Sequence, residues 1–337
     1  VIDVKKHIRE QYGDVLSQYR KTLYCSYHTT AGYFEQTLCE RLDQSPDSLQ
    51  VFLRPFQELF PEGAEYQHDR LDLRTELSAE ERKNEPRNAD SHLKYIGSGL
   101  ENCVTYANRP LAPVFFIDLD GMNADRPRKR RSTVIGFNDD EVVGRMEFEI
   151  PVSGHGIDSI SLRDARLGIY EQLQDLVLRH GVEKGWIEIE LDPRERNTGL
   201  TVNEYETLLM KHDLLDVLRD PLRFVKEKGR NMLRNPRAIP GKAKNYAKYD
   251  LVRFVNEALD ALGLSESVIE RVIDRILALP ASRFLRMKRS IRLLVCEGET
   301  KDGGLIVQGT YQSPILVQWR KTDRGSRRLS ATLNRCI

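Results

Sequence analysis

Residues 157–191 read IDSISLRDARLGIYEQLQDLVLRHGVEKGWIEIEL, and this stretch describes a short strand, a helix and a second strand. We predict a helix from about Leu162 to His180, because apolar side chains recur there near the helical period of about 3.6 residues. Gly181 follows it and is the residue type that commonly ends a helix. Residues 186–191 alternate apolar and polar side chains, which is typical of a strand with one buried face.

A weaker stretch near the N-terminus has the same order. Ile2-Asp3 opens it, a polar helix-like segment follows, and residues 23–27 resemble a strand. The ends of the two halves also correspond. Strands are expected at 104–106, 113–119 and 132–137 in the first half, and at 292–296, 304–307, 312–319 and 329–333 in the second. Together these patterns predict an internal repeat.

The repeat predicts two domains of one fold, residues 1–140 and 141–337, which meet at the turn Asn138-Asp139-Asp140. Each domain would be α+β, with antiparallel sheets packed against helices. The second domain carries an extra helical insertion at about 205–288. Its first strand, 144–152, has no counterpart in the first half, and we expect residues before Val1 to supply one.

A basic stretch lies inside this insertion, at about residues 219–248. It contains Pro236, Pro240 and Gly241, which interrupt regular structure. The stretch is interpreted as an anion-binding surface, a mobile loop or a solvated helix face, and the sequence leaves these alternatives open.

Composition excludes several classes of protein. The 52 Lys and Arg residues nearly balance the 51 Asp and Glu residues, which argues against a surface built as a whole for nucleic acid. The mean hydropathy is -0.51 and no apolar run is long enough to span a membrane, so we expect no membrane helix. Five scattered Cys residues form neither a disulfide framework nor a thiolate zinc motif. These features favour a cytoplasmic protein.

Three histidines of the first half are the best candidates for chemistry: His28, His68 and His92. His28 opens a Thr-Thr-Ala-Gly turn, where Thr29 and Thr30 offer hydroxyl groups and the backbone offers N–H donors to an anion. His92 stands at a probable helix start, where the helix N-terminus could hold a phosphate. Three imidazoles suit zinc or another divalent metal, acid–base catalysis or phosphate contacts equally well, and they also occur as ordinary core or surface residues.

Polar residues of the same helix start could take part. Asn88 and Asp90 are candidate N-caps, and Lys94 could contact a phosphate. In the second half, Asn203 and Glu204 follow a Thr-Gly-Leu-Thr-Val run, and Gln312 opens an apolar strand. A carboxylate and two amides could serve as a base and as substrate anchors, or they could be ordinary strand-end residues.

At these residues the sequence resembles the YjbQ-like family, also called the secondary thiamine-phosphate synthase family. The family pattern HTTAGLTxNE is divided between residues 28–32, HTTAG, and residues 199–204, GLTVNE. A Tyr-x-His motif matches residues 66–68, NADAHLK matches residues 88–94 except at Ser91, and the closing GTWQS matches residues 309–313 except at Tyr311. The resemblance therefore covers nearly the whole chain as two tandem, diverged copies, apart from the helical insertion.

The two copies depart from the family pattern in complementary ways. The first keeps the three histidines and lacks the Asn-Glu and Gln, whereas the second keeps Asn203, Glu204 and Gln312 and has Glu195 where the first histidine would stand. We therefore hypothesise one composite site per pair of copies. The resemblance implies that His28, His68, His92 and Glu204 are catalytic, and that the three histidines could bind a metal. The ligand-binding residues would be Thr29, Thr30, Asn88, Asp90, Lys94, Asn203 and Gln312.

Two functions remain open. The resemblance implies a transferase like thiamine-phosphate synthase, in which a pyrimidine diphosphate loses pyrophosphate as a thiazole phosphate attacks, with zinc or magnesium as the divalent ion. Its partner would be a phosphorylated small molecule. The alternative is a non-catalytic module that binds a ligand, a protein or nucleic acid through the basic insertion. Because the family is expected to assemble as trimers, a homo-oligomer is a further expectation.

Overall fold

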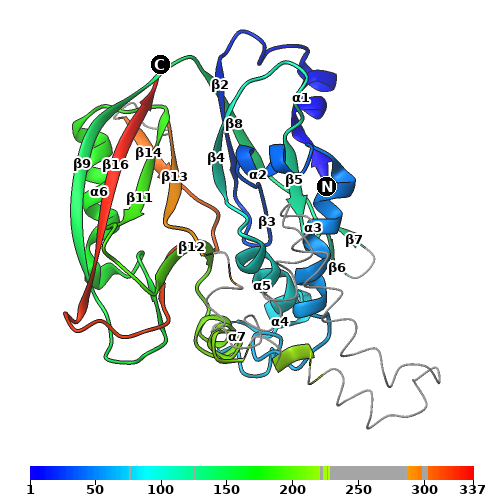
Figure 1. Cartoon of the computed structure of the whole chain (residues 1–337), viewed down its shortest axis with the longest axis vertical. Coiled ribbons are helices and arrows are strands. Elements are labelled where there is room, and N and C mark those ends of the chain that lie inside the picture. The colour runs from blue at the N-terminus through cyan, green and yellow to red at the C-terminus, as the bar shows by residue number, and fades with distance from the viewer. Residues whose placement is uncertain are drawn as a thin grey trace, which may run out of the picture. The chain divides into compact units, whose positions relative to one another are not determined.

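The computed structural model describes residues 1–75, 77–123, 126–220, 223–225, 227, 285, 287–297 and 303–337 (Figure 1). The chain divides into two compact units. Unit 1 comprises Val1–Gln36, Gly99–Tyr205 and Met287–Ile337, and unit 2 comprises Thr37–Ser98 and Glu206–Arg286. Most of the expected helical insertion, including the basic stretch beyond residue 227, lies outside the described residues. The division differs from the expected boundary at residues 140 and 141, which stays a prediction.

Unit 1 contains all of the described strands and three helices. The helices are α1 (Val4–Tyr12), the 3-10 helix η1 (Ala165–Leu167) and α6 (Ile169–Arg179). The strands are β1 (Ile2–Asp3), β2 (Lys21–Ser26), β3 (Ala31–Gly32), β4 (Cys103–Ala107), β5 (Phe115–Asp118), β6 (Met122–Asn123), β7 (Arg126–Pro127), β8 (Ser132–Phe137), β9 (Asp140–Pro151), β10 (Asp158–Ser161), β11 (Gly185–Leu191), β12 (Thr198–Glu204), β13 (Ser290–Glu297), β14 (Gly304–Val307), β15 (Gln312–Gln318) and β16 (Ser326–Cys336).

The α+β class is confirmed, and every strand pairing among the described residues is antiparallel. One boundary differs from the expectation, because α6 begins at Ile169 and not at Leu162. Asp164 accepts the backbone N–H of Arg166 and starts a short 3-10 turn instead, and Gly168 ends that turn with a left-handed φ of 61°. Gly181 has a φ of 57° just after the helix, as expected for its position.

The same two strand orders occur twice along the chain. The three-stranded sheet β1-β5-β3 of the first half has the same order as β10-β15-β12 of the second half. The sheet β4-β2-β8 likewise has the same order as β13-β11-β16, which gains β14 at one edge and β9 at the other. Corresponding strands therefore occupy corresponding places in both halves.

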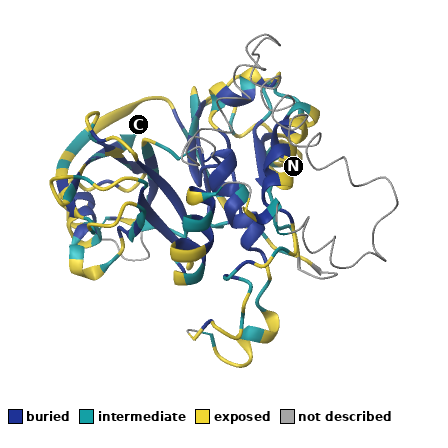
Figure 2. Cartoon of the chain, turned by 60° about the horizontal axis from the view of Figure 1, so that its bottom comes forward, coloured by how far each residue is buried: buried dark blue, intermediate teal, exposed yellow. Residues whose placement is uncertain are grey.

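The main core of unit 1 lies between α6 and the five-stranded sheet β14-β13-β11-β16-β9 (Figures 1 and 2). Ile169, Leu173, Leu176 and Val177 form the buried face of the helix, which follows the apolar spacing of the sequence. A second apolar cluster joins β2, β4 and β8 to the opposite sheet, where Phe137 meets Trp186 with 5.7 Å between ring centroids. The strands from the first and the second half of the chain therefore share one apolar layer within unit 1.

Unit 2 is helical in its described part. Its helices are α2 (Gln36–Arg41, whose first residue belongs to unit 1), α3 (Pro46–Leu59), α4 (Glu81–Asn84), α5 (Ala89–Ser98), the π-helix η2 (Leu209–Asp213) and α7 (Leu214–Arg219). Every residue of α5 except Lys94 is buried. A Cβ at Gly97 would lie 2.9 Å from the ring of Phe60, so only glycine permits this close approach of α5. None of the described helices has the length and apolar character that crossing a membrane requires.

Candidate functional site

Two of the three candidate histidines lie together in unit 2. His92 is the fourth residue of α5, and His68 lies in the loop between α3 and α4. Their ring centroids are 5.1 Å apart with the planes at 77°, and both side chains are fully buried. A buried imidazole needs polar partners for its two nitrogens, so this pair defines a polar centre within a largely apolar helical unit.

Glu206 holds the ring of His68. Its Oε2 lies 3.3 Å from His68 Nδ1, and its carboxylate accepts the backbone N–H groups of Leu208 and Leu209 at 2.8 Å each. Burial would raise the pKa of Glu206, but the hydrogen bonds from His68 and from these two N–H groups outweigh burial and lower it. The ionised carboxylate therefore places the hydrogen of His68 on Nδ1 and leaves the lone pair on Nε2.

Asp213 fixes the loop that carries His68. Its carboxylate accepts the backbone N–H groups of Gln67 at 2.8 Å and of His68 at 2.9 Å. Burial raises the pKa of Asp213 to about 7, against the lowering effect of those hydrogen bonds. Sequence reasoning missed both Glu206 and Asp213. Glu206 stands only two residues after the Asn-Glu motif, at the start of a helical run, and that position could have revealed it.

The residues around the start of α5 have structural partners. The side-chain amide of Asn88 lies 3.4 Å from His68 Nε2, and with the lone pair on Nε2 this amide must turn its NH2 group toward the ring. Asp69 accepts the first N–H of α5, that of Ala89, at 3.0 Å, and capping by Asn88 or Asp90 stays a prediction. Lys94 forms an ion pair with Asp90 one turn earlier. The expected phosphate contact of Lys94 would have to compete with this carboxylate.

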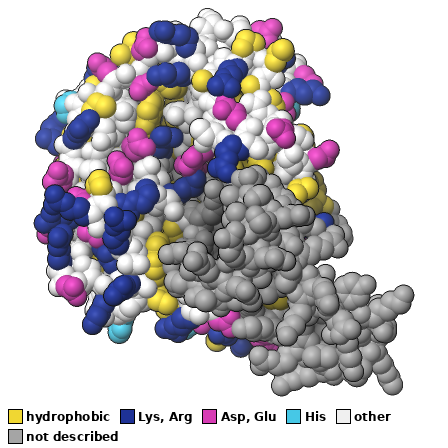
Figure 3. Space-filling model, viewed as in Figure 1, with side chains coloured by type: hydrophobic (Ala, Val, Ile, Leu, Met, Phe, Trp, Pro, Cys, Tyr) yellow, Lys and Arg dark blue, Asp and Glu magenta, His cyan; other side chains and the backbone are white. Residues whose placement is uncertain are grey.

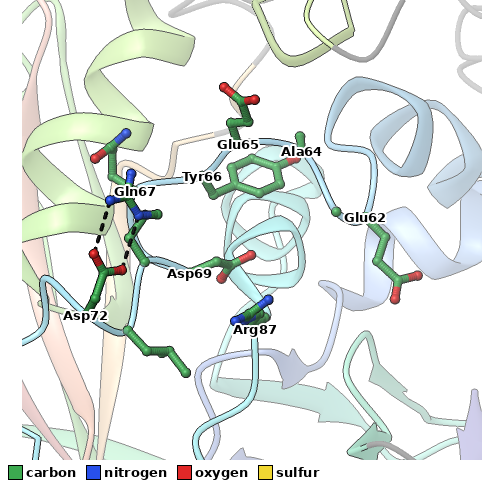
Figure 4. A pocket seen from close by; sticks show the side chains of 11 residues that line it. Glu62, Ala64, Glu65, Tyr66, Gln67, Asp69, Asp72 and Arg87 are labelled. Atoms are coloured by element: carbon green, nitrogen blue, oxygen red, sulfur yellow. Dashed lines mark hydrogen bonds and ion pairs between the residues drawn. The ribbon is translucent and has the colours of Figure 1, made fainter. Parts of the chain in front are cut away.

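A pocket of about 810 Å³ lies beside the histidine-bearing loop in unit 2 (Figure 4). Gln67 and Asp69, the neighbours of His68 in the chain, both line it, and Asp69 lies close to Arg87 in the view. Its charged residues are four carboxylates and two guanidinium groups: Glu62, Glu65, Asp69, Asp72, Arg70 and Arg87. The excess of negative charge suits a cationic group better than a phosphate.

His28 lies in unit 1, in the turn between β2 and β3, whereas His68 and His92 belong to unit 2. Its Nε2 accepts the backbone N–H of Arg131 at 2.7 Å. Burial, and then the nearby positive charge of Arg130, lower the pKa of His28 to about 4, so the ring is neutral at pH 7. With Nε2 accepting, the hydrogen must be on Nδ1, and neither nitrogen has a lone pair for a metal. This geometry corrects the expected metal-ligand role of His28.

The shifted pKa of His28 predicts a pH dependence of stability. Between pH 6.5 and about 4 the unfolded imidazole binds a proton that the folded one does not, so the free energy of unfolding should fall as the pH is lowered through this window. His28→Gln keeps a side-chain acceptor and should flatten the dependence. Urea unfolding at several pH values checks this, with the exposed His7→Gln as a control. An equally steep dependence in His28→Gln would contradict the assignment.

Two amides of the second half hold the His28 turn. Gln312 Nε2 donates to the carbonyl oxygens of Ser26 and His28, both at 2.9 Å, and Asn203 Nδ2 donates to the carbonyl oxygen of Thr29 at 2.9 Å. A Cβ at Gly309 would lie 1.9 Å from the carbonyl oxygen of Tyr27, which explains the glycine before Gln312. The expected anchors of a substrate are thus engaged in fixing the turn.

The remaining candidates also lie in unit 1. Thr30 donates its hydroxyl hydrogen to Asp120 at 3.5 Å, which is a long contact, and the half-buried Thr29 follows His28 in the turn. Glu204 is the last residue of β12, opposite Gln312, and its side chain is half-buried. The structure therefore brings His28, Thr29, Asn203 and Gln312 together in one unit, and His68, His92, Asn88, Asp90 and Lys94 in the other.

Equivalent polar contacts occur in both halves of unit 1. The backbone N–H of Arg131 donates to His28, and that of Arg328 donates to Glu195 Oε1 at 3.1 Å. Glu195 is the residue that the expected repeat aligns with His28. The guanidinium of Arg130 likewise binds Asp118 and the carbonyl oxygen of Asp120, whereas that of Arg327 binds Gln318 and the carbonyl oxygen of Arg320.

Several solved structures are similar to this chain. One is a YbjQ-like protein of unknown function from Sulfolobus solfataricus P2, at 16% identity and a TM-score of 0.30, covering 58% of this chain and 99% of that one. A hypothetical protein from Aeropyrum pernix K1 has 12% identity and a TM-score of 0.29, and covers 57% and 98%. An uncharacterized conserved protein of the yjbq/upf0047 family from Clostridium acetobutylicum has 15% identity and a TM-score of 0.27, and covers 56% and 98%.

The matches span almost the whole of each similar structure but little more than half of this chain. Neither a family model nor a curated protein matches the sequence.

Proposed function

We propose that the chain consists of two diverged copies of one YjbQ-like domain, residues 1–140 and 141–337, which together form one composite site. The repeated strand orders support this proposal, because each sheet of the first half has a counterpart of the same order in the second. The equivalent contacts of Arg131 with His28 and of Arg328 with Glu195 support it at the level of single residues. Such agreement in both topology and side-chain contacts is expected of a duplicated domain.

We propose further that His68 and His92 bind a divalent metal ion, and that the chain is a transferase acting on a phosphorylated small molecule. The observation that carries the proposal is the buried imidazole pair, in which Glu206 fixes His68 with its lone pair on Nε2, beside the side-chain amide of Asn88. A carboxylate behind a ligand histidine is a common feature of metal sites. Glu204 is the proposed third ligand, because only Tyr205 separates it from Glu206 in the chain.

The donor set fits zinc better than magnesium. Two imidazole nitrogens and one carboxylate are the ligands of many catalytic zinc sites, in which the fourth position stays open. Magnesium prefers oxygen ligands in octahedral geometry and is not usually bound by two histidines. We therefore name zinc as the ion for His68, His92 and Glu204, with Glu206 and Asp213 as the groups that position His68.

The proposed reaction is the one that the family resemblance implies, the displacement of pyrophosphate from a pyrimidine diphosphate by a thiazole phosphate. A bound divalent ion would offset the negative charge that develops on the departing pyrophosphate. The acidic pocket beside His68 would orient the substrate through a positively charged ring or amino group, since its four carboxylates outnumber its two guanidinium groups.

A metal analysis tests the proposal directly. We expect the purified chain to bind about one zinc ion, measured by elemental analysis and by titration with a fluorescent zinc indicator. Turnover of the two phosphorylated substrates should depend on that ion. A chain that binds no zinc at micromolar concentrations would overturn the metal site. Zinc binding without turnover would overturn the transferase activity and favour the alternative of a non-catalytic ligand-binding module.

The role of Glu206 gives a separate prediction. Glu206→Gln should weaken zinc binding by about 10- to 100-fold, because the neutral amide no longer fixes the tautomer of His68. The same titration measures this, with Glu81→Gln on the surface of α4 as a control for the loss of one carboxylate. Unchanged affinity in Glu206→Gln would mean that Glu206 serves only the two N–H groups of the following turn.

A further inference from the structure

Two turns at one end of unit 1 carry a cluster of cations. Arg194 and Arg196 lie in the turn between β11 and β12, and Arg320, Lys321 and Arg324 lie in the turn between β15 and β16. All five side chains are exposed, and none forms an ion pair within the part of the chain that the structure describes. We call these five residues the basic turn surface. Figure 3 shows Lys and Arg side chains gathered at the lower left, where the red β15–β16 turn runs in Figure 1.

A buried arginine holds the two turns side by side. Arg327, only 4% exposed, donates to the carbonyl oxygens of Arg196 at 2.9 Å and Arg320 at 2.6 Å. The backbone N–H of Trp319 also donates to the carbonyl oxygen of Asn197 at 2.9 Å. These bonds involve the backbone of the turns, so the exposed side chains are presented on a rigid support and remain available to a ligand.

In the corresponding turns of the first half, part of the positive charge is neutralised. There Asp118 and Asp120 form ion pairs with Arg130 and Arg128. Ala31 pairs with Asp118 and Thr198 pairs with Gln318, and the expected repeat aligns Ala31 with Thr198. Neutral Gln318 and cationic Arg320 of the second half therefore correspond to Asp118 and Asp120. The second half has therefore exchanged two carboxylates for one amide and one guanidinium, and its two turns hold the five exposed cations against the exposed Asp323 and the half-buried Asp192.

We propose that the basic turn surface binds the phosphate backbone of single-stranded nucleic acid. Five guanidinium and ammonium groups on two adjacent turns match a chain of repeated negative charges better than one small anion. Trp319, half-buried and directly before Arg320, adds an aromatic ring to the surface, and an unpaired base can stack on the face of such a ring. No large apolar side chain of these turns is exposed, so the surface has nothing to insert into a lipid bilayer.

Binding of a fluorescein-labelled 20-nucleotide oligouridylate to the full chain, measured by anisotropy at several salt concentrations, tests the proposal. Five phosphate contacts predict a slope of log K against log salt of about -3.5. Replacing Arg196, Arg320 and Arg324 with Gln should reduce the slope to about -1.4 and the affinity by about a hundredfold in roughly 0.1 M salt. Thermal unfolding of the triple variant should be unchanged, since these side chains have no partners in the described part of the chain.

A matched triple variant controls for total charge. Lys129→Gln, Arg145→Gln and Arg179→Gln remove three exposed cations elsewhere on unit 1 and should leave the affinity within about threefold. Equal losses in both triple variants would overturn the proposal in favour of non-specific attraction. Absence of oligouridylate binding at low salt would also overturn the proposal. So would binding of the chain to phosphatidylserine vesicles that an excess of oligouridylate does not displace, because the surface would then prefer lipid headgroups.

Discussion

Replacing His92 with Ala is expected to abolish zinc binding and, with it, turnover. The side chain is fully buried next to His68, so its loss removes one of two imidazole ligands and leaves an opening that water alone can fill. We expect the affinity for zinc to fall at least about a hundredfold and kcat/KM by about a thousandfold or more. His68→Ala should have the same effect, and the double variant should be no worse than either single one, because both ligands serve a single ion.

The controls for this prediction separate chemistry from folding. His212→Ala removes an exposed imidazole from the same unit and should leave zinc binding and turnover unchanged. His92→Gln keeps a polar side chain of similar size in the buried site, so it should retain the fold while losing the metal. Near-ultraviolet circular dichroism reports the fold of each variant. Full zinc affinity in a folded His92→Gln protein would exclude His92 as a ligand.

Much of the fold follows from local patterns in the sequence. The alternation of residues 186–191 predicted the strand β11, and the apolar spacing of residues 169–177 predicted the helix α6. Burial of one face requires apolar residues to recur every two residues in a strand and about every 3.6 residues in a helix. The strand orders of the two halves could be anticipated because similar strand patterns recur in the same sequence order. What local patterns could not reveal is the start of α6, because the left-handed Gly168 and the cap at Asp164 compete with helical propensity there.

The candidate site was only partly predictable, for a different reason. The motifs single out His28, His68 and His92 as chemically similar residues, but the tautomer of each ring depends on partners that are distant in sequence. Arg131 is 103 positions from His28, and Glu206 is 138 positions from His68. These partners make His28 a neutral acceptor and place the lone pair of His68 on Nε2, the atom that we propose binds the metal. Motif reading alone assigns all three the same role, and the structure separates them.

The largest effect on stability is expected from Arg327→Met. Arg327 and Glu195 form a buried ion pair at 2.9 Å, with the two side chains 4% and 7% exposed. Removing the guanidinium leaves a buried carboxylate with an unneutralised charge and also frees the carbonyl oxygens of Arg196 and Arg320. Loss of one member of such a pair costs about 3–5 kcal/mol in the free energy of unfolding. Urea unfolding of the purified variant measures the loss.

A double variant distinguishes the cost of an unpaired charge from the value of the pair itself. Arg327→Met with Glu195→Leu replaces both charges by apolar groups, and it should recover much of the stability lost in Arg327→Met alone. Arg328→Met is the matched control, because Arg328, the next residue in the chain, pairs with Glu149 at the surface, and that pair should contribute less than about 1 kcal/mol. The double variant could instead lose as much free energy of unfolding as Arg327→Met and Glu195→Leu together. In that case the unpaired buried carboxylate would not be the source of the cost. The hydrogen bonds that Arg327 donates to the turns would then account for it.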